Sequence, residues 1–155
     1  MPRGSTTVDG VTIYAIRRRV VCYVTRSAGA GLELLVLGHA GDEPAGTQVP
    51  AGDMLPFESV DAAALREVRE QCGLVDLIFK HQLGAVELGL QEPEGPSLTT
   101  YVALGGPVDG PQAWPHEVSG DGPDAGMTFY CRWELLPLGH ELAPGQGVYL
   151  DGLSG

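Results

Sequence analysis

The sequence has few basic residues and no long apolar run. Only 9 of its 155 residues are Lys or Arg, against 20 Asp or Glu, and the formal net charge is −11. A chain this acidic repels phosphate backbones, which disfavours DNA and RNA as partners, but it attracts metal cations. No segment reaches the roughly 18 to 20 apolar residues of a membrane span, and the N-terminus lacks the apolar core of a secretory signal. We therefore expect a cytoplasmic protein that binds neither nucleic acid nor membranes.

Cysteine and histidine are also scarce. The 3 cysteines, Cys22, Cys72 and Cys131, match the spacing of neither a zinc cluster nor a disulfide framework, so reduced thiols packed in the core are the favoured interpretation. The 4 histidines lack HExxH or similar spacing. The chain also has no GxSxG motif, no P-loop and no GxGxxG entering a helix, so each of those enzyme classes is set aside.

The apolar content is sufficient for one core. Hydrophobic residues make up 43 % of the chain, and a length of 155 residues suits one domain. Residues 1–10 are small and polar, and we expect them to form a frayed tail. We expect a single domain over residues 11–155.

Apolar periodicity predicts several strands. A hairpin is expected from residues 20–25 and 33–37, which flank a glycine-rich loop, and a short strand is expected to enter the turn near residue 51. Further strands are predicted at 75–79, 83–88, 98–104 and 127–135, the last from strict alternation of apolar and polar residues. Residues 105–126 are predicted to form a long loop, and loops of that length are often functional.

One helix is predicted, over residues 59–72. Leu65, Val68 and Cys72 fall on one face at helical spacing. Ser59 is a suitable N-cap, and Gly73 suits a left-handed C-terminal cap. No long closing helix is expected after residue 137, because glycine and proline are frequent there.

The opposite side of this helix carries Glu67, Glu70 and Gln71. Two glutamates three residues apart can reach one hard cation, and oxygen donors are what Mg²⁺ and Mn²⁺ prefer. From the helix alone, a solvated polar face is the competing interpretation.

A longer pattern surrounds these residues. Gly52 is followed after five residues by Glu58, and after seven more by Arg66 and Glu67; the run ends in Val68, Glu70, Gln71, Gly73 and Leu74. This segment resembles the Nudix box, GX5EX7REUXEEXGU with U aliphatic, and all but one of the specified positions agree. The sequence VPAG upstream also resembles the usual entry to the box.

The resemblance implies a fold and a metal site. The fold would be an α/β/α sandwich with a mixed, mostly antiparallel sheet and the box helix packed on it. The implied cofactor is Mg²⁺ or Mn²⁺, held by the carbonyl of Gly52 and the side chains of Glu67, Glu70 and Gln71, with Glu67 and Glu70 as the catalytic residues. The resemblance also implies that Glu58 pairs with Arg66 and braces the loop against the helix.

The implied reaction is hydrolysis of a diphosphate linkage in a nucleoside diphosphate derivative. Gln71 stands where the family usually has a glutamate, and a neutral amide gives a hard cation less attraction than a carboxylate. We therefore expect weakened metal binding. The alternatives are a Nudix-fold nucleotide-binding or sensory module without turnover, and a scaffold with no small-molecule site. A second departure, Phe57 in place of a frequent glycine, is expected to alter loop shape.

Residues outside the box offer further groups. Among the acids of the 105–126 segment, Glu117 is the first choice for an additional metal ligand, ahead of Asp121 and Asp124, although a solvated loop also explains them. Arg17 and Arg19 would share one face of an extended segment, either to bind substrate phosphate or to protect an edge strand. The expected partner is a small nucleotide-type substrate. We also consider a homodimer of the chain. Three aromatic residues are candidates for stacking on a base or for the core: Tyr101, Trp114 and Phe129.

Overall fold

Strand β3 (Arg17–Ala28) lies in the interior of the main sheet, and its central residues are apolar on both faces. Val20, Cys22 and Val24 belong to the core cluster on one side of the sheet. Val21 and Tyr23 belong to the cluster on the other side. A strand covered on both faces is expected to be almost continuously apolar, as this one is.

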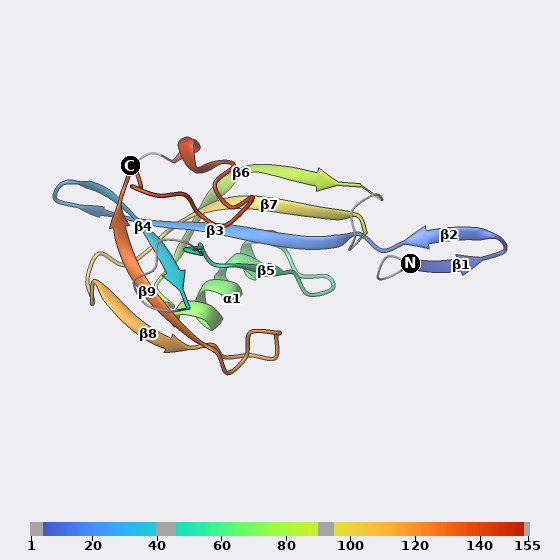
Figure 1. The fold of residues 1–155 in the computed structure, drawn as a ribbon, viewed down its shortest axis with the longest axis horizontal. Helices are drawn as coiled ribbons and strands as arrows, with labels where there is room; N and C mark the ends of the chain where they lie inside the picture. The colour runs from blue at the N-terminus through green and yellow to red at the C-terminus, as the bar shows by residue number, and fades with distance from the viewer. Residues whose placement is uncertain (1–4, 40–45, 90–94, 154–155) are drawn as a thin grey trace.

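The structure is a computed structural model that describes residues 5–39, 46–89 and 95–153. The main sheet has the order β6-β7-β3-β4-β9-β8, with β5 paired to β3, and β1 and β2 form a separate hairpin that extends from the body (Figure 1). The remaining strands are β1 (Ser5–Val8), β2 (Val11–Tyr14), β4 (Gly31–Gly38), β5 (Ala51–Asp53), β6 (Ile78–Leu88), β7 (Ser97–Gly105), β8 (Ala113–Glu117) and β9 (Thr128–Leu135).

The pairing is mixed and mostly antiparallel. Only β3 and β7 run parallel among the described pairs, with Arg17 opposite Ser97. The other neighbours, including β3 with β4 and β6 with β7, are antiparallel. The predicted sheet type is confirmed.

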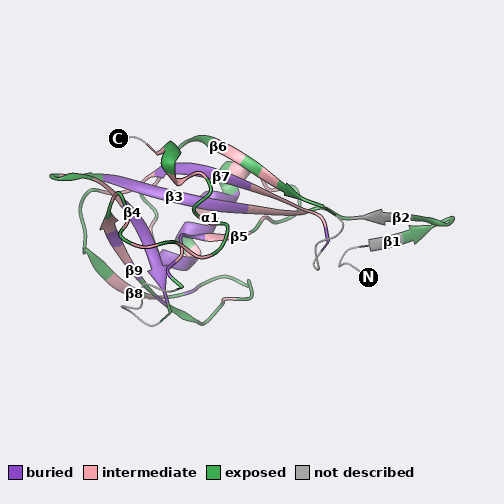
Figure 2. Cartoon of the chain, turned by 45° about the horizontal axis from the view of Figure 1, so that its top comes forward, coloured by how far each residue is buried: buried purple, intermediate pink, exposed green. Residues whose placement is uncertain are grey.

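Helix α1 (Val60–Cys72) packs on one face of the sheet, and its predicted position is confirmed. The Ala62 N–H donates to Oγ of Ser59 at 3.3 Å, and Gly73 ends the helix at φ 78°. Ala64 and Val68 are fully buried against the sheet. Figure 2 shows the buried part of α1 in purple, beside the sheet.

The other face is covered by the C-terminal segment, which contains the 3₁₀ helix η1 (Leu150–Gly152). The Tyr23 hydroxyl donates to the Gln146 carbonyl, and the Tyr101 hydroxyl donates to the Gly145 carbonyl at 2.6 Å. Apolar side chains of the segment pack on this face: Leu136, Leu138, Leu142, Tyr149, Leu150 and Leu153. Helical elements therefore flank both faces of the sheet, and the predicted Nudix-type sandwich is confirmed.

Several elements differ from the sequence predictions. The loop of the first hairpin is shorter than expected, since β3 and β4 extend until only residues 29 and 30 separate them; Arg26 and Glu33 form a cross-strand ion pair there at 2.7 Å. Residues 75–77 are not a strand, and β6 is one continuous strand whose irregular register breaks the alternating pattern.

The expected long loop contains edge strand β8, where Pro115 is tolerated. Near the N-terminus, Ser5–Val8 pairs with Val11–Tyr14 in place of the expected fraying, whereas residues 1–4 lie outside the described residues. The domain limits stay a prediction. None of the described helices combines the length and apolar character needed to cross a bilayer.

Candidate functional site

Arg66 connects the acidic residues of the box. Its Nε and Nη2 atoms donate to the two carboxylate oxygens of Glu58 at 2.7 and 2.9 Å. Its Nη1 donates to Glu67 at 3.0 Å and to Glu70 at 3.2 and 3.3 Å. Nη2 also donates to the Asp53 carbonyl at 3.0 Å. One guanidinium therefore holds three carboxylates and the end of β5 together.

This network changes the protonation of its members. The hydrogen bonds from Arg66 lower the pKa of Glu58, so that this carboxylate stays charged. The same contact with Glu58 raises the pKa of Arg66 above its usual value, so the guanidinium is permanently charged. The link between Glu58 and Arg66 is therefore a charge-assisted, two-point contact.

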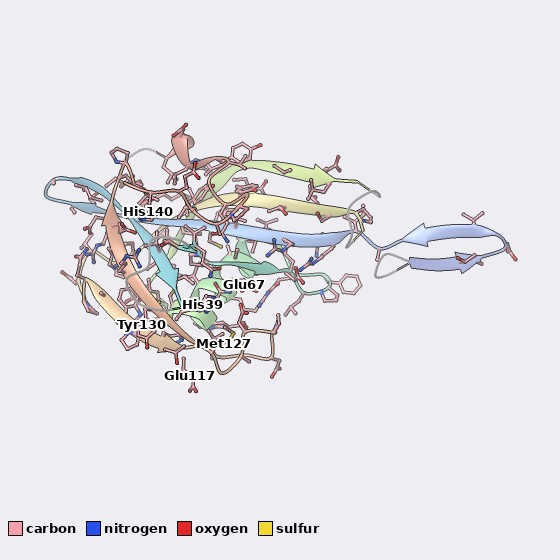
Figure 3. The ribbon with its side chains drawn as sticks, viewed as in Figure 1. His39, Glu67, Glu117, Met127, Tyr130 and His140 are labelled. Atoms are coloured by element: carbon pink, nitrogen blue, oxygen red, sulfur yellow. The ribbon has the colours of Figure 1, made fainter. Side chains whose placement is uncertain are left out.

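Glu67 is the least solvated acid of the group, with 8 % exposure. Burial raises its pKa to about 7; Arg66 opposes the shift, and Glu70 and Asp124 add to it. A carboxyl group that titrates near neutrality can both accept and release a proton under ordinary conditions. Without a bound ion, Glu67 is therefore divided between its charged and neutral forms near pH 7; Figure 3 shows it at helix α1.

Two glycines lie directly against the paired carboxylates. A Cβ added to Gly52 would sit 2.5 Å from the carboxylate atoms of Glu67, and one added to Gly120 would sit 2.5 Å from Oε1 of Glu70. Gly120 also has φ +89°, a conformation that other residues rarely adopt. The backbone of β5 and the loop after β8 thus enclose the two glutamates from different directions.

The side chain of Gln71 makes hydrogen bonds that differ from the contacts expected of a metal ligand. Its Oε1 accepts from the Ala51 N–H at 3.2 Å, while its Nε2 donates to the Ala51 carbonyl at 2.8 Å and to Oε2 of Glu67 at 3.1 Å. Only this orientation of the amide satisfies all three partners. The side chain joins helix α1 to β5 and directs its N–H groups, not its oxygen, at Glu67.

The acids of the long segment lie in different surroundings. Glu117 is an exposed residue on edge strand β8, and Figure 3 shows it at the periphery, away from Glu67. Asp124 lies in the loop between β8 and β9 and acts electrostatically on Glu67. The Ser119 N–H of this loop donates to the Glu70 carbonyl at 3.0 Å.

Arg17 and Arg19 lie together at the start of β3. Both donate through Nε to Oδ1 of Asp53, at 2.9 and 3.2 Å, and all three side chains are about one-third to one-half exposed. Arg18, on the opposite face, donates to the carbonyls of Leu55 and Glu58. The sequence from Arg17 to Arg19 therefore supports both ends of the loop that leads into the box helix.

The donor set suits an ion that keeps part of its water shell. Within the described residues, no group of three or more His, Cys, Asp or Glu side chains is arranged to hold a metal. Mg²⁺ is commonly bound by one or two carboxylates and completes its shell with water and substrate phosphate. Glu67 and Glu70 are such a pair, and their oxygens keep acceptor positions beyond those used by Arg66 and Gln71.

The fold and the site define an α/β domain that carries a pair of carboxylates on helix α1. The model of the NUDIX domain matches residues 15–145, and the chain belongs to the Nudix family. No curated protein sequence matched the chain.

Several solved structures share the fold. The Nudix hydrolase RenU from M. smegmatis has 16 % identity and a TM-score of 0.60, covering 94 % of this chain and 88 % of its own. The NUDIX domain of Shewanella oneidensis NrtR, complexed with ADP ribose, has 17 % identity and a TM-score of 0.58, covering 90 % and 84 %. A UDP-X diphosphatase has 10 % identity and a TM-score of 0.59, covering 92 % and 63 %.

Sequence reasoning missed two participants in the site. Gly120 is distant from the box in sequence, and a single glycine in a loop rich in glycine carries no distinguishing signal. The second is the backbone of Ala51, which only the folded pairing of β5 with β3 brings opposite Gln71. Asp124 is one of four acids in residues 105–126, and no sequence feature ranks it above Glu117.

Proposed function

We propose that this protein hydrolyses a diphosphate linkage in a nucleoside diphosphate derivative, using Mg²⁺ or Mn²⁺ bound at Glu67 and Glu70. The observation that carries the proposal is the convergence of these two carboxylates on Arg66, between the backbones of Gly52 and Gly120. Family membership supports the reaction class. The ADP ribose bound to the NrtR domain supports the ligand class. The proposed location is the cytoplasm.

The proposed roles are metal binding, proton transfer and phosphate binding. Glu67, Glu70 and the Gly52 carbonyl would hold the ion, which supplies charge neutralisation at the phosphate and lowers the pKa of water. Glu67, the more buried carboxylate of the pair, would also accept a proton from water. Arg17 and Arg19, now shared with Asp53, are the cations that would bind substrate phosphate.

Arg66 keeps two like charges together before an ion binds. Glu67 and Glu70 would repel each other without a cation between them, and Nη1 of Arg66 supplies one at 3.0 to 3.3 Å. Its other edge is fixed on Glu58, so Arg66 holds the carboxylates in place and has little freedom to leave. The acidic pair is therefore preorganised.

The test is phosphate release from a panel of nucleoside diphosphate derivatives with Mg²⁺ and then Mn²⁺. We expect Glu67→Gln and Glu70→Gln each to lower the rate by about a hundredfold or more, the size typical of losing a general base or its metal. Glu87→Gln, which changes an exposed glutamate on β6, is the matched control and should leave the rate unchanged. Equal rates in all three variants would overturn the proposal.

Asp124 is the acid that we propose in addition to the box, in preference to Glu117. It is the loop acid that raises the pKa of Glu67. Asp124→Asn should lower the rate by about tenfold, whereas Glu117→Gln should behave as wild type. The reverse order would restore Glu117 as the additional ligand.

A binding module without turnover is the second candidate function. Gln71 favours it, because an amide that donates to Glu67 leaves the site with less negative charge than a third carboxylate would. A thermal-shift titration with the same nucleotides, run beside the rate assay, separates the two functions. Stabilisation by a nucleotide with no phosphate release under either metal would establish the binding module.

A further inference from the structure

The last turn of α1 ends against β8, and this contact includes the backbone of Glu70. The final carbonyls of a helix have no partner within the helix, so other parts of the chain must donate to them. The Glu70 carbonyl accepts two hydrogen bonds, one from Nε2 of His116 at 3.2 Å and one from the Ser119 N–H at 3.0 Å. Because a carbonyl can only accept, Nε2 of His116 carries a proton.

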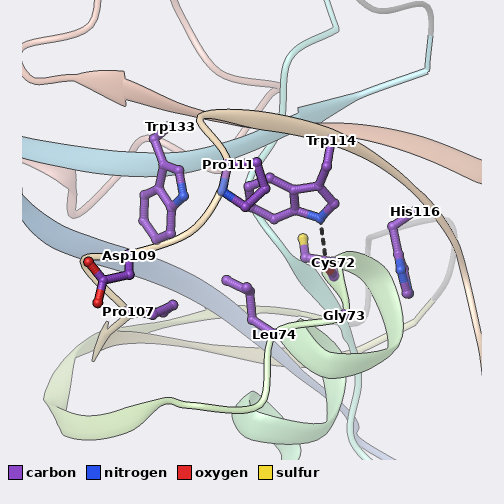
Figure 4. A pocket seen from close by; sticks show the side chains of 9 residues that line it. All are labelled: Cys72, Gly73, Leu74, Pro107, Asp109, Pro111, Trp114, His116 and Trp133. Atoms are coloured by element: carbon purple, nitrogen blue, oxygen red, sulfur yellow. Dashed lines mark hydrogen bonds between the residues drawn. The ribbon is translucent and has the colours of Figure 1, made fainter.

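The neighbouring carbonyls are held in a similar way. Nε1 of Trp114 donates to the Cys72 carbonyl at 2.9 Å, and the thiol of Cys131 donates to the Gln71 carbonyl at 3.9 Å. Figure 4 shows Trp114 and His116 beside the end of the helix, with the bond from Trp114 as a dashed line. Side chains of β8 and β9 therefore satisfy the carbonyls of the last turn of α1.

The position of His116 is fixed by the strand and by packing. It lies opposite Phe129 in the antiparallel register of β8 and β9. A Cβ added to Gly73 would sit 2.9 Å from two atoms of the His116 ring, so the ring packs directly on the residue that ends the helix. A residue that supports a functional group must itself be held by its surroundings, and His116 meets this condition.

Glu70 is thus held at both its side chain and its main chain. Arg66 donates to its carboxylate at 3.2 and 3.3 Å, and a Cβ at Gly120 would sit 2.5 Å from the same group. His116 and Ser119 hold its carbonyl. A carboxylate moves with its main chain, and a small displacement of a functional group is costly.

We propose that His116 is a positioning residue for the metal site: its Nε2–H fixes the main chain of Glu70 and so directs the Glu70 carboxylate toward the ion. His116 acts through this backbone carbonyl and is not itself a ligand. The presence of the ion rests on the proposed function, but the hydrogen bond does not depend on hydrolysis. Metal affinity should therefore depend on a donor at this atom and not on the imidazole ring as such.

The test compares three replacements of His116 by calorimetric binding of Mn²⁺ to the full chain without nucleotide. Glutamine carries a donor nitrogen at nearly the reach of Nε2, asparagine holds its donor closer to the main chain, and alanine has none. We expect His116→Asn and His116→Ala to weaken binding by about fivefold, and His116→Gln to stay within about twofold of wild type. His81→Gln, at an exposed histidine of β6, is the control and should match wild type.

Two results of this comparison would overturn the proposal. Equal affinity in all variants would show that the hydrogen bond does not position Glu70. Equal loss in His116→Gln and His116→Ala would show that the packing of the ring matters and the donor does not. A purely structural role would lower the free energy of unfolding in urea and leave the Mn²⁺ affinity of the folded protein unchanged.

The variants should fold, because the His116 ring borders a pocket of about 280 Å³ and its truncation enlarges an existing space. A metal-free measurement on the same proteins is hydrogen exchange of the Ser119 amide, which shares the Glu70 carbonyl with His116. This exchange should be about fivefold faster in His116→Ala and unchanged in His116→Gln. Unchanged exchange in His116→Ala would overturn the proposal, as would a neutral wild-type ring protonated on Nδ1 by NMR.

Rate measurements separate this proposal from the proposed function. In a hydrolase, His116→Ala should need about fivefold more Mn²⁺ for half-maximal rate, and saturating Mn²⁺ should restore kcat with KM for the nucleotide unchanged. If wild type hydrolyses no nucleotide while Mn²⁺ affinity and Ser119 exchange respond as predicted, the proposed function alone fails. If wild type hydrolyses its substrate and neither readout responds to His116→Ala, the positioning role alone fails.

Discussion

Replacing Gln71 by glutamate tests whether its amide is a structural link or a weakened metal ligand. The amide joins α1 to β5 by donating to the Ala51 carbonyl and to Glu67, and by accepting from the Ala51 N–H. Gln71→Glu keeps the acceptor but removes both donated bonds. It also places a second carboxyl group against Glu67, in a position where Gln71 is only 5 % exposed.

The expected cost follows from these contacts. Each lost hydrogen bond removes about 1 kcal/mol, and a partner left without a donor adds to that, so Gln71→Glu should lower the free energy of unfolding by about 2 to 4 kcal/mol. The assay is urea unfolding at pH 7 without divalent metal, with the same m-value required of both proteins. The loss should shrink as the pH falls, because a proton on either carboxyl group removes the repulsion and restores a donor.

Gln82→Glu is the control for this experiment. It makes the same change of charge at an exposed glutamine on β6 and should alter the free energy of unfolding by less than about 0.5 kcal/mol. If Gln71→Glu is as stable as this control without metal, the amide is not the link that the structure indicates, and the reasoning is refuted.

Three further predictions concern other parts of the chain. Gly120→Ala should lower hydrolysis by at least tenfold, because the new Cβ displaces the adjacent carboxylate, whereas Gly122→Ala, with nothing within 4 Å, should leave the rate unchanged. Phe57 has φ 64° and a fully exposed ring, so Phe57→Gly should raise the free energy of unfolding by about 1 kcal/mol in urea, and Phe57→Ala should not. The hydrogen bond from Arg26 lowers the pKa of Glu33 below its ordinary value of 4.5, so its contribution to stability is present above that pH and is lost as the pH falls through the lower folded-state pKa. Acid unfolding of Glu33→Gln should lack this part of the pH dependence; a curve parallel to wild type would contradict it.

The box helix was predictable because its signals are local. Ser59, the apolar face and Gly73 mark its start, its packing side and its end, and each of these acts within a few residues of the helix. The same is true of β9, whose alternation reflects one buried face and one solvated face. The family resemblance, in turn, rests on fixed spacing within one continuous segment.

Features that depend on distant segments were not predictable. The pairing of β5 with β3 sets the position of Ala51, and through it the orientation of Gln71. Gly84 lies inside the predicted strand 83–88, and nothing in the sequence indicates that it makes room for the Tyr149 ring, to which an added Cβ would come within 2.3 Å. Asp124 and Glu117 are alike in sequence, and only the path of the loop after β8 distinguishes them.

The most direct test of the account is equilibrium binding of Mn²⁺, measured by calorimetry on the full chain without nucleotide. One site is expected in wild type and in Glu87→Gln. In Glu67→Gln and Glu70→Gln the affinity should be lower by at least tenfold, because each loses one of the two carboxylates that face the ion. Undiminished affinity in both box variants would show that the paired glutamates do not hold the metal.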